Sequence, residues 1–233
     1  MRIISFSKMH FGKKLAPENS MKTPPSSQKK MYANPVIELL SQSGPVMMSL
    51  FHLSLIAFLI YTGMERAEFT QKITIPFLFF SAFFTWTLAE YLLHRYVFHY
   101  IREDNKLIQA FHFALHGYHH QEPNDANRLF MPPVPAALIL TLFLGLFYLM
   151  MKEYAWIFLA GFETGYLTYS FVHYSVHTRK APKTLHFLWK HHALHHFKYP
   201  DKAFGVSSRL WDRVFGTMPP RDERPGAVDV HAR

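Results

Sequence analysis

The sequence predicts an all-α integral membrane protein, in which four transmembrane helices carry a cytoplasmic, histidine-rich helical cap that holds a di-metal site. Three observations lead to this fold class. Apolar residues gather in four runs, each close to the 20 residues that cross a bilayer as a helix. Of the 25 Lys and Arg residues, 22 lie in the two tails and one internal connection. Thirteen of the 16 histidines fall between His94 and His196.

The four expected spans cover residues 46–63, 73–93, 134–151 and 154–172. Pro76 lies near the start of the second span, where a helix tolerates proline. The third span begins directly after a proline-rich MPPVP stretch, which suits a helix entry better than a helix interior. Only residues 152 and 153 separate the third and fourth spans. These two spans are therefore expected to form a helical hairpin.

The distribution of positive charge predicts the orientation. Only Arg66, Lys72 and Lys152 lie outside the tails and the connection between the second and third spans. Cytoplasmic loops carry the excess of Lys and Arg in membrane proteins, so both termini and that connection are expected in the cytoplasm. All histidine clusters then lie on the cytoplasmic face, of either a bacterial inner membrane or the endoplasmic reticulum.

The expected domain organisation has three parts. Residues 1–45 form a polar N-terminal tail, residues 46–217 one membrane domain, and residues 218–233 a flexible C-terminal tail. The stretch 16–28, APENSMKTPPSSQ, has the composition of a disordered segment, and residues 1–30 contain no secretory signal pattern.

Composition excludes several kinds of site. With no cysteine, the chain has no disulfide, no thiolate-ligated haem and no cysteine-ligated iron–sulfur cluster. The net charge of +9 could indicate nucleic-acid binding, but the positive-inside distribution accounts for it better, so no nucleic-acid partner is expected.

The histidine clusters read HRYVFH, HFALHGYHH, HYSVH and HHALHH. Several histidines are four residues apart, so on a helix they share one face. His94 and His99 are five apart, which suits the frayed end of a helix better than its middle. Neutral imidazole binds zinc, iron and copper, and one metal needs about four to six donors. The clusters therefore supply enough donors for two metals.

Not every histidine is expected to bind metal. His112 and His191 fall outside the repeated HxxHH pattern and suit roles behind the ligands. Four more are expected to be non-ligands, namely His10, His52, His186 and His231.

Two other protein classes fit part of the pattern: a soluble helical protein with Phe-rich buried helices, and a histidine-rich membrane metal transporter. A transporter should have ionisable residues deep in several spans, whereas here Glu163 is the main one.

The chain resembles the fatty acid hydroxylase superfamily, the membrane histidine-box oxygenases, and within it the fatty acid 2-hydroxylases of sphingolipids. The resemblance covers about residues 90–217. Its histidine-bearing stretches are EYLLHRYVFH, HFALHGYHH, GYLTYSFVHYSVH and LWKHHALHH. NRLFMPPVPA at 127–136 and FGVSSRLWDRVFGT at 204–217 are the stretches that separate this branch from its relatives.

The resemblance implies ten ligands on two metals and no catalytic side chain beyond them. One metal would take His94, His99, His116, His120 and His195, and the other would take His119, His173, His177, His192 and His196. The metals are expected to be iron in the working protein, with zinc in some isolated samples, and dioxygen is the expected co-substrate.

The implied reaction is hydroxylation of a lipid acyl chain at C2, on a fatty acid or a ceramide. A desaturase or sterol oxidase of the same superfamily is the alternative. Eukaryotic relatives carry a fused cytochrome domain, and the roughly 45 residues before the first span are too few for one. The expected electron source is therefore a separate ferredoxin- or cytochrome-type donor with its reductase. The segment 203–217 is expected either to lie in the membrane interface or to pack over the metal site.

Overall fold

The computed structural model describes residues 30–68 and 72–220, and within these ranges it contains helices and loops but no strand. The expected tails up to residue 29 and from residue 221, with His10 and His231, lie outside the described residues. The α-helices are α1 (Pro35–Leu40), α2 (Pro45–Arg66), α3 (Thr74–Leu93), α4 (Lys106–His112), α5 (Tyr118–Gln121), α6 (Pro133–Met151), α7 (Ala155–Thr178), α8 (His186–Phe197) and α9 (Leu210–Val214). Four short pieces connect them: the π-helices η1 (His94–Phe98) and η2 (Phe113–Gly117), and the 3₁₀-helices η3 (Ala126–Arg128) and η4 (Lys152–Tyr154).

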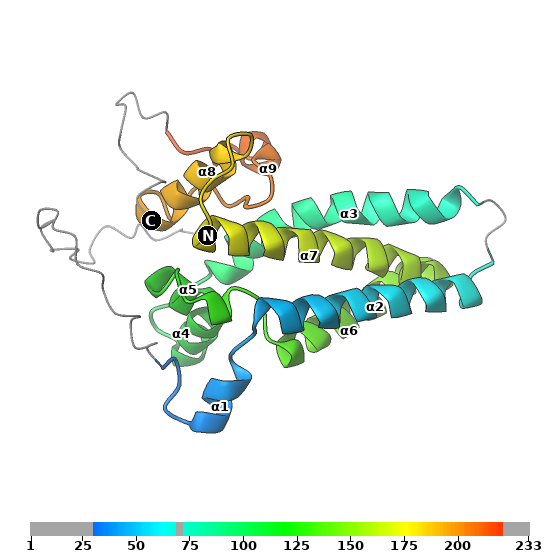
Figure 1. Ribbon diagram of the computed structural model, residues 1–233, viewed down its shortest axis with the longest axis horizontal. Helices are drawn as coiled ribbons and strands as arrows, with labels where there is room; N and C mark the ends of the chain where they lie inside the picture. Colours follow the sequence, from blue (N-terminus) through cyan, green and yellow to red (C-terminus); the bar gives the residue numbers. More distant parts are fainter. Residues whose placement is uncertain (1–29, 69–71, 221–233) are drawn as a thin grey trace, which may run out of the picture.

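The long helices α2, α3, α6 and α7 lie side by side as a bundle, and α4, α5, α8 and α9 gather at one end of it as a cap (Figure 1). Helix α7 is the centre of the bundle, since it contacts α2, α3 and α6. Its last turns reach into the cap and carry His173 and His177 there. One continuous helix therefore joins the apolar bundle to the histidine-rich cap.

Among the described residues, three segments are long and apolar enough to cross a membrane: Pro45–Arg66, Thr74–Phe98 and Ala126–Thr178. The sequence predicted four spans. The third segment includes both α6 and α7, because only the short η4 turn interrupts them. Lys152 has a φ of 53° in this turn, so the chain reverses there instead of continuing as one helix. The expected hairpin of α6 and α7 is present.

Of the expected polar tail of residues 1–45, the structure describes residues 30–45. Residues 35–40 form α1, whose N-terminus is capped by the side chain of Asn34. Helix α1 is bonded to the cap, as described below.

Close approach of α3 and α7 depends on small residues. A Cβ added at Gly161 would lie 2.1 Å from the carbonyl oxygen of Phe79, and one added at Gly165 would lie 2.5 Å from the Cβ of Trp86. Trp86 and Phe162 pack edge to face in the same contact, with ring centroids 5.0 Å apart. Glycine in α7 thus lets the backbones meet and the aromatic side chains interlock.

Replacing Gly161 by alanine should destabilise the bundle, because the obstacle is backbone, which a rotamer change cannot move. Overpacking of this kind costs about 1–3 kcal/mol or more of unfolding free energy. The matched control is Gly145→Ala on α6, where nothing lies within 4 Å of the added Cβ. Thermal unfolding in detergent should show a lowered midpoint for Gly161→Ala and an unchanged or raised one for Gly145→Ala. Equal midpoints would contradict the close α3–α7 contact.

Candidate metal centre

A π-helical turn explains the five-residue spacing of His94 and His99. The sequence predicted a frayed helix end here, but α3 continues into η1, where the His99 amide donates to the His94 carbonyl at 3.2 Å. An i→i+5 bond makes five residues close to one turn, so both rings lie on the same face. Their Nε2 atoms are 3.3 Å apart. Single π turns in α-helices are frequent at functional sites.

A second π turn, η2, precedes the next histidines. It leads from α4 into α5, and it places His116 and His120 together, with their Nε2 atoms 2.9 Å apart. The neighbouring His119 points to different partners, since its Nε2 lies 3.0 Å from that of His173 on α7 and 3.1 Å from that of His196 on α8. One short segment thus supplies donors to two separate groups.

The ten expected ligands form two groups of five. The ligand nitrogens within each group lie within 4.8 Å of one another. The first cluster is His94, His99, His116, His120 and His195; the second cluster is His119, His173, His177, His192 and His196. This division is the one that the family resemblance implies. The clusters adjoin, because the rings of His120 and His196 stack with centroids 4.2 Å apart.

Backbone carbonyls fix the tautomers of several rings. His195 donates from Nδ1 to the Lys202 carbonyl at 2.7 Å, and His94 donates from Nδ1 to the Phe204 carbonyl. Because a carbonyl oxygen only accepts, each of these neutral rings carries its proton on Nδ1 and has a lone pair on Nε2. Both lone pairs face the Nε2 of His99, at 3.0 and 3.3 Å. One hydrogen on His99 cannot satisfy both, whereas a metal ion among these nitrogens would, so the donor set fits a metal.

Burial keeps the cap imidazoles neutral. Removal from water lowers the pKa of His116, His119 and His192 well below the usual range, and neighbouring histidines lower it further. The same two causes lower the pKa of His120 and of His195 to about 3. Neutral imidazole is the form that binds metal, so these rings need lose no proton to do so.

The carbonyls that orient His94 and His195 belong to residues 202–208, here called the Phe204 loop. Two buried carboxylates hold it. Asp212, with no exposed surface, accepts hydrogen bonds from the amides of Phe204 at 2.9 Å and Gly205 at 2.8 Å. Glu90 on α3 accepts from the amides of Val206 at 2.7 Å and Ser207 at 2.9 Å. The loop is therefore clamped from both sides.

Asp212 was not predicted as a site residue, although the FGVSSRLWDRVFGT stretch contains the signal. Its carboxylate also accepts from Thr217 Oγ1 at 2.7 Å and from His191 Nε2 at 3.0 Å. The segment folds back on itself, so that its first residues and its last threonine all bond to the carboxylate of its aspartate. Within segment 203–217, Phe204 and Val206 are buried, whereas Val214 and Phe215 are exposed.

The remaining described histidines lie outside both clusters. His191 is buried and donates from Nε2 to the carboxylate of Asp212. His112 is half-buried beside Gly117. His52 is buried in the bundle against Glu163. His186 begins α8 and is not among the ten.

Fold and site together define a class of protein: a helical bundle with segments long and apolar enough to span a membrane, whose cap holds two adjoining clusters of five imidazoles suited to metal. Residues 79–217 match the fatty acid hydroxylase family, which is more than half of the chain. The chain belongs to this family.

Relatives of known activity and structure are similar over much of the chain. Fatty acid 2-hydroxylase of Rattus norvegicus is 39% identical over 152 residues, covering 64% of this chain and 41% of that protein. The dihydroceramide fatty acyl 2-hydroxylase FAH2 of Arabidopsis thaliana is 42% identical over 138 residues, covering 58% of this chain and 57% of the relative. A solved structure of full-length scs7p, with only the hydroxylase domain visible, superposes with a TM-score of 0.73 at 32% identity, covering 79% of this chain and 70% of that one. The chain thus spans only part of the length of these relatives.

Proposed function

We propose that this protein is a membrane di-metal monooxygenase that hydroxylates C2 of a lipid acyl chain, on a fatty acid or a ceramide. The observation that carries the proposal is the pair of adjoining five-histidine clusters inside the segment that matches the family. The relatives named fatty acid 2-hydroxylase and dihydroceramide fatty acyl 2-hydroxylase support the substrate class.

The two metals are proposed to be iron, one in each cluster, held by its five imidazoles. When bound, iron supplies redox chemistry with dioxygen, the oxygen source for the new hydroxyl group. Zinc also suits imidazole and can occupy such sites in an isolated sample, but it has no redox chemistry and would leave the protein inactive. The overall reaction consumes dioxygen, two electrons and two protons, and it yields the hydroxylated chain and water. A separate ferredoxin- or cytochrome-type donor with its reductase provides the electrons.

The chain's own residues would bind the metals, orient the ligand rings and limit the access of water. The tautomers of His94 and His195 are set by backbone carbonyls of the Phe204 loop, so the donors are positioned before any metal arrives. His94 and His195 are also buried, with 2% and 0% of their surface exposed, which keeps water from these two rings. The clusters lie where the cap meets the bundle, so an acyl chain can approach from the bilayer while its headgroup stays at the interface.

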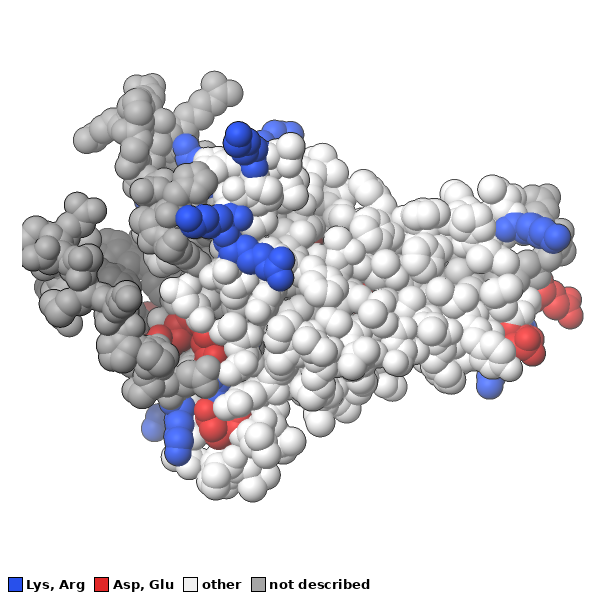
Figure 2. Space-filling view, viewed as in Figure 1, with Lys and Arg blue, Asp and Glu red and all other residues white. Residues whose placement is uncertain are grey.

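The proposed topology has four crossings, with the third segment passing twice as α6 and α7 and with the cap in the cytoplasm. Support comes from the charge distribution: Lys and Arg gather at the cap end, while the bundle surface in Figure 2 is white along most of its length. Residues 46–217 then form the hydroxylase unit. Reporter fusions in the connections 67–73 and 152–154 should both read as non-cytoplasmic; cytoplasmic readings at both would overturn this topology.

Lipid profiling tests the activity. The protein is expressed in a host that makes sphingolipids, with its electron donors, under heavy dioxygen. Mass spectrometry should show acyl chains that gain one heavy oxygen, placed at C2 by fragmentation. A loss of two hydrogens instead would indicate a desaturase, and oxygen on a sterol would indicate a different branch of the superfamily.

A further inference from the structure

Helix α1 exposes an apolar surface that the protein itself does not cover. None of its six residues is buried. Val36, Ile37, Leu39 and Leu40 are exposed by 63%, 49%, 70% and 61% of their surface. Four large apolar side chains on six consecutive residues are unusual for a surface that faces water.

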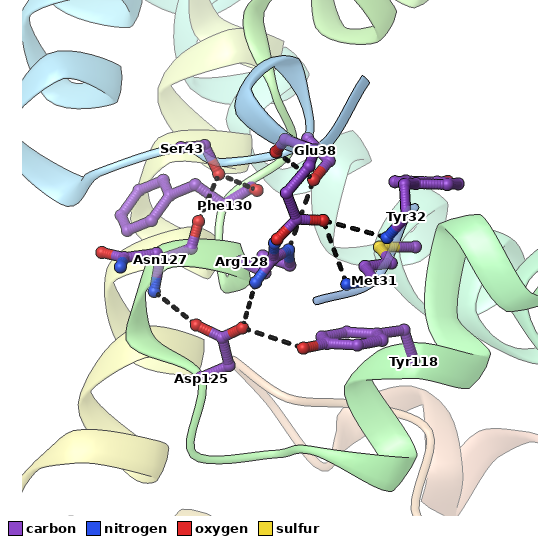
Figure 3. Close-up of polar contacts among 10 residues, drawn as sticks. Met31, Tyr32, Glu38, Ser43, Tyr118, Asp125, Asn127, Arg128 and Phe130 are labelled. Carbon is purple, nitrogen blue, oxygen red and sulfur yellow. Dashed lines mark hydrogen bonds and ion pairs between the residues drawn. The ribbon is translucent and has the colours of Figure 1, made fainter. Parts of the chain in front are cut away.

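The one acidic residue of α1 turns the other way, toward the cap (Figure 3). Glu38 pairs with the guanidinium of Arg128 and accepts from the backbone amides of Met31 at 3.0 Å and Tyr32 at 2.9 Å. Burial alone would raise the pKa of Glu38, but these hydrogen bonds and the charge of Arg128 lower it on balance. Arg128 also pairs with Asp125. The outward direction of the apolar residues is therefore fixed by a partly buried ionic network.

The position of α1 is fixed relative to the bundle as well. Ser43, just after α1, donates from its backbone amide to the Asn127 carbonyl at 2.7 Å and from its hydroxyl to the Phe130 carbonyl. Helix α2 begins at Pro45, so only the residues 41–44 separate α1 from a spanning helix. In Figure 1, α1 lies next to the cap end of α2, at the level where the bundle begins.

The apolar residues of α1 continue the outer surface of α2. Val46, Met47 and Leu50, at the start of α2, are exposed by 73%, 49% and 63%. Figure 2 shows a largely uncharged surface over α1 that runs into the uncharged side of the bundle. The medium that covers the outer surface of α2 can therefore also contact the apolar side chains of α1.

We propose that α1 lies in the plane of the membrane interface and inserts Val36, Ile37, Leu39 and Leu40 at the boundary between lipid headgroups and acyl chains. Short amphipathic segments bind membranes in this way when one face is apolar and the other is held in a polar setting. The ion pair between Glu38 and Arg128 connects α1 to the second cluster. Arg128 directly precedes Leu129, whose carbonyl lies 3.4 Å from Nδ1 of His173. Helix α1 therefore seats the cap on the bilayer at the side of the second cluster. The inference rests on the membrane topology proposed above.

Spin-label accessibility tests the proposal, and the chain is convenient for it because it contains no cysteine. Leu39→Cys and Val36→Cys are labelled with a nitroxide in the full chain, in phosphatidylcholine vesicles containing a minority of phosphatidylglycerol. The lipid control is Leu142→Cys, in the middle of α6 and 72% exposed. The water control is Asp104→Cys, on the cap, with 69% of its side chain exposed. Collisions of each label with oxygen, which concentrates in lipid, and with a water-soluble nickel chelate are measured.

The labels at positions 36 and 39 should show an oxygen-to-nickel collision ratio several-fold above that at position 104, and nearer to that at position 142. A ratio equal to that at position 104 would place α1 in water and overturn the proposal. Low collision with both reagents would mean that a protein surface, such as a second copy, covers α1, and would overturn it too. A label at position 142 that fails to behave as lipid-exposed would instead refute the proposed topology.

Discussion

Replacing His195 by alanine is expected to abolish hydroxylation. His195 has no exposed surface, and its Nε2 lies 3.0 Å from that of His99 in the first cluster. Loss of an outer-shell partner alone lowers metal affinity or activity by about 10- to 100-fold, so loss of a ligand should lower product yield by more than about 100-fold. His119→Ala should do the same through the second cluster. The measurement is the amount of 2-hydroxylated lipid per amount of protein.

His186→Ala is the matched control, because His186 lies at the start of α8 but belongs to neither cluster. It should keep most of the activity. Full activity in both His195→Ala and His119→Ala would show that the ligand assignment is wrong.

Replacing Asp212 by alanine should lower the unfolding free energy strongly. The substitution leaves the buried amides of Phe204 and Gly205 without their acceptor, along with the hydroxyl of Thr217. Each unsatisfied buried group costs about 1–3 kcal/mol, so the unfolding free energy should fall by about 3 kcal/mol or more. Thermal unfolding of the metal-free protein in detergent measures this.

Asp212→Ala should also affect the two clusters unequally. The Phe204 loop orients His94 and His195, which both belong to the first cluster, and makes no such bond to the second. Metal should therefore be lost from the first cluster and kept in the second. The exposed carboxylate of Asp104 provides the control, since Asp104→Ala should change neither stability nor metal content. Equal loss from both clusters would mean that Asp212 only stabilises the fold.

The sequence was sufficient to predict the grouping of the ten histidines and much of the bundle. Apolar runs predicted the long helices, because hydrophobicity over about 20 residues is a local property of the sequence. The ten histidines and their division into two groups followed from motif resemblance, and the structure gathers the same residues. What the spacing could not indicate was the π turn at His94–Phe98, since five-residue spacing fits no regular helical face.

The contacts that support the site were harder to predict, because they join distant parts of the chain. Glu90 bonds Val206 across 116 residues, and Glu38 bonds Arg128 across 90. In neither pair does the sequence around one residue contain a periodic pattern that would identify the other residue as its partner. The same holds for α1, which is too short for helical periodicity to be visible and lies within a segment of polar composition.

Counting the metal bound to the intact protein tests the central claim most directly. After loading with ferrous iron under reducing conditions and removal of loosely bound metal, elemental analysis against quantitative amino-acid analysis should give two metals per chain, one for each cluster of five imidazoles. A ratio that stays at one or below after loading would contradict the account, because one of the two clusters would then be a packing of neutral histidines and not a metal site.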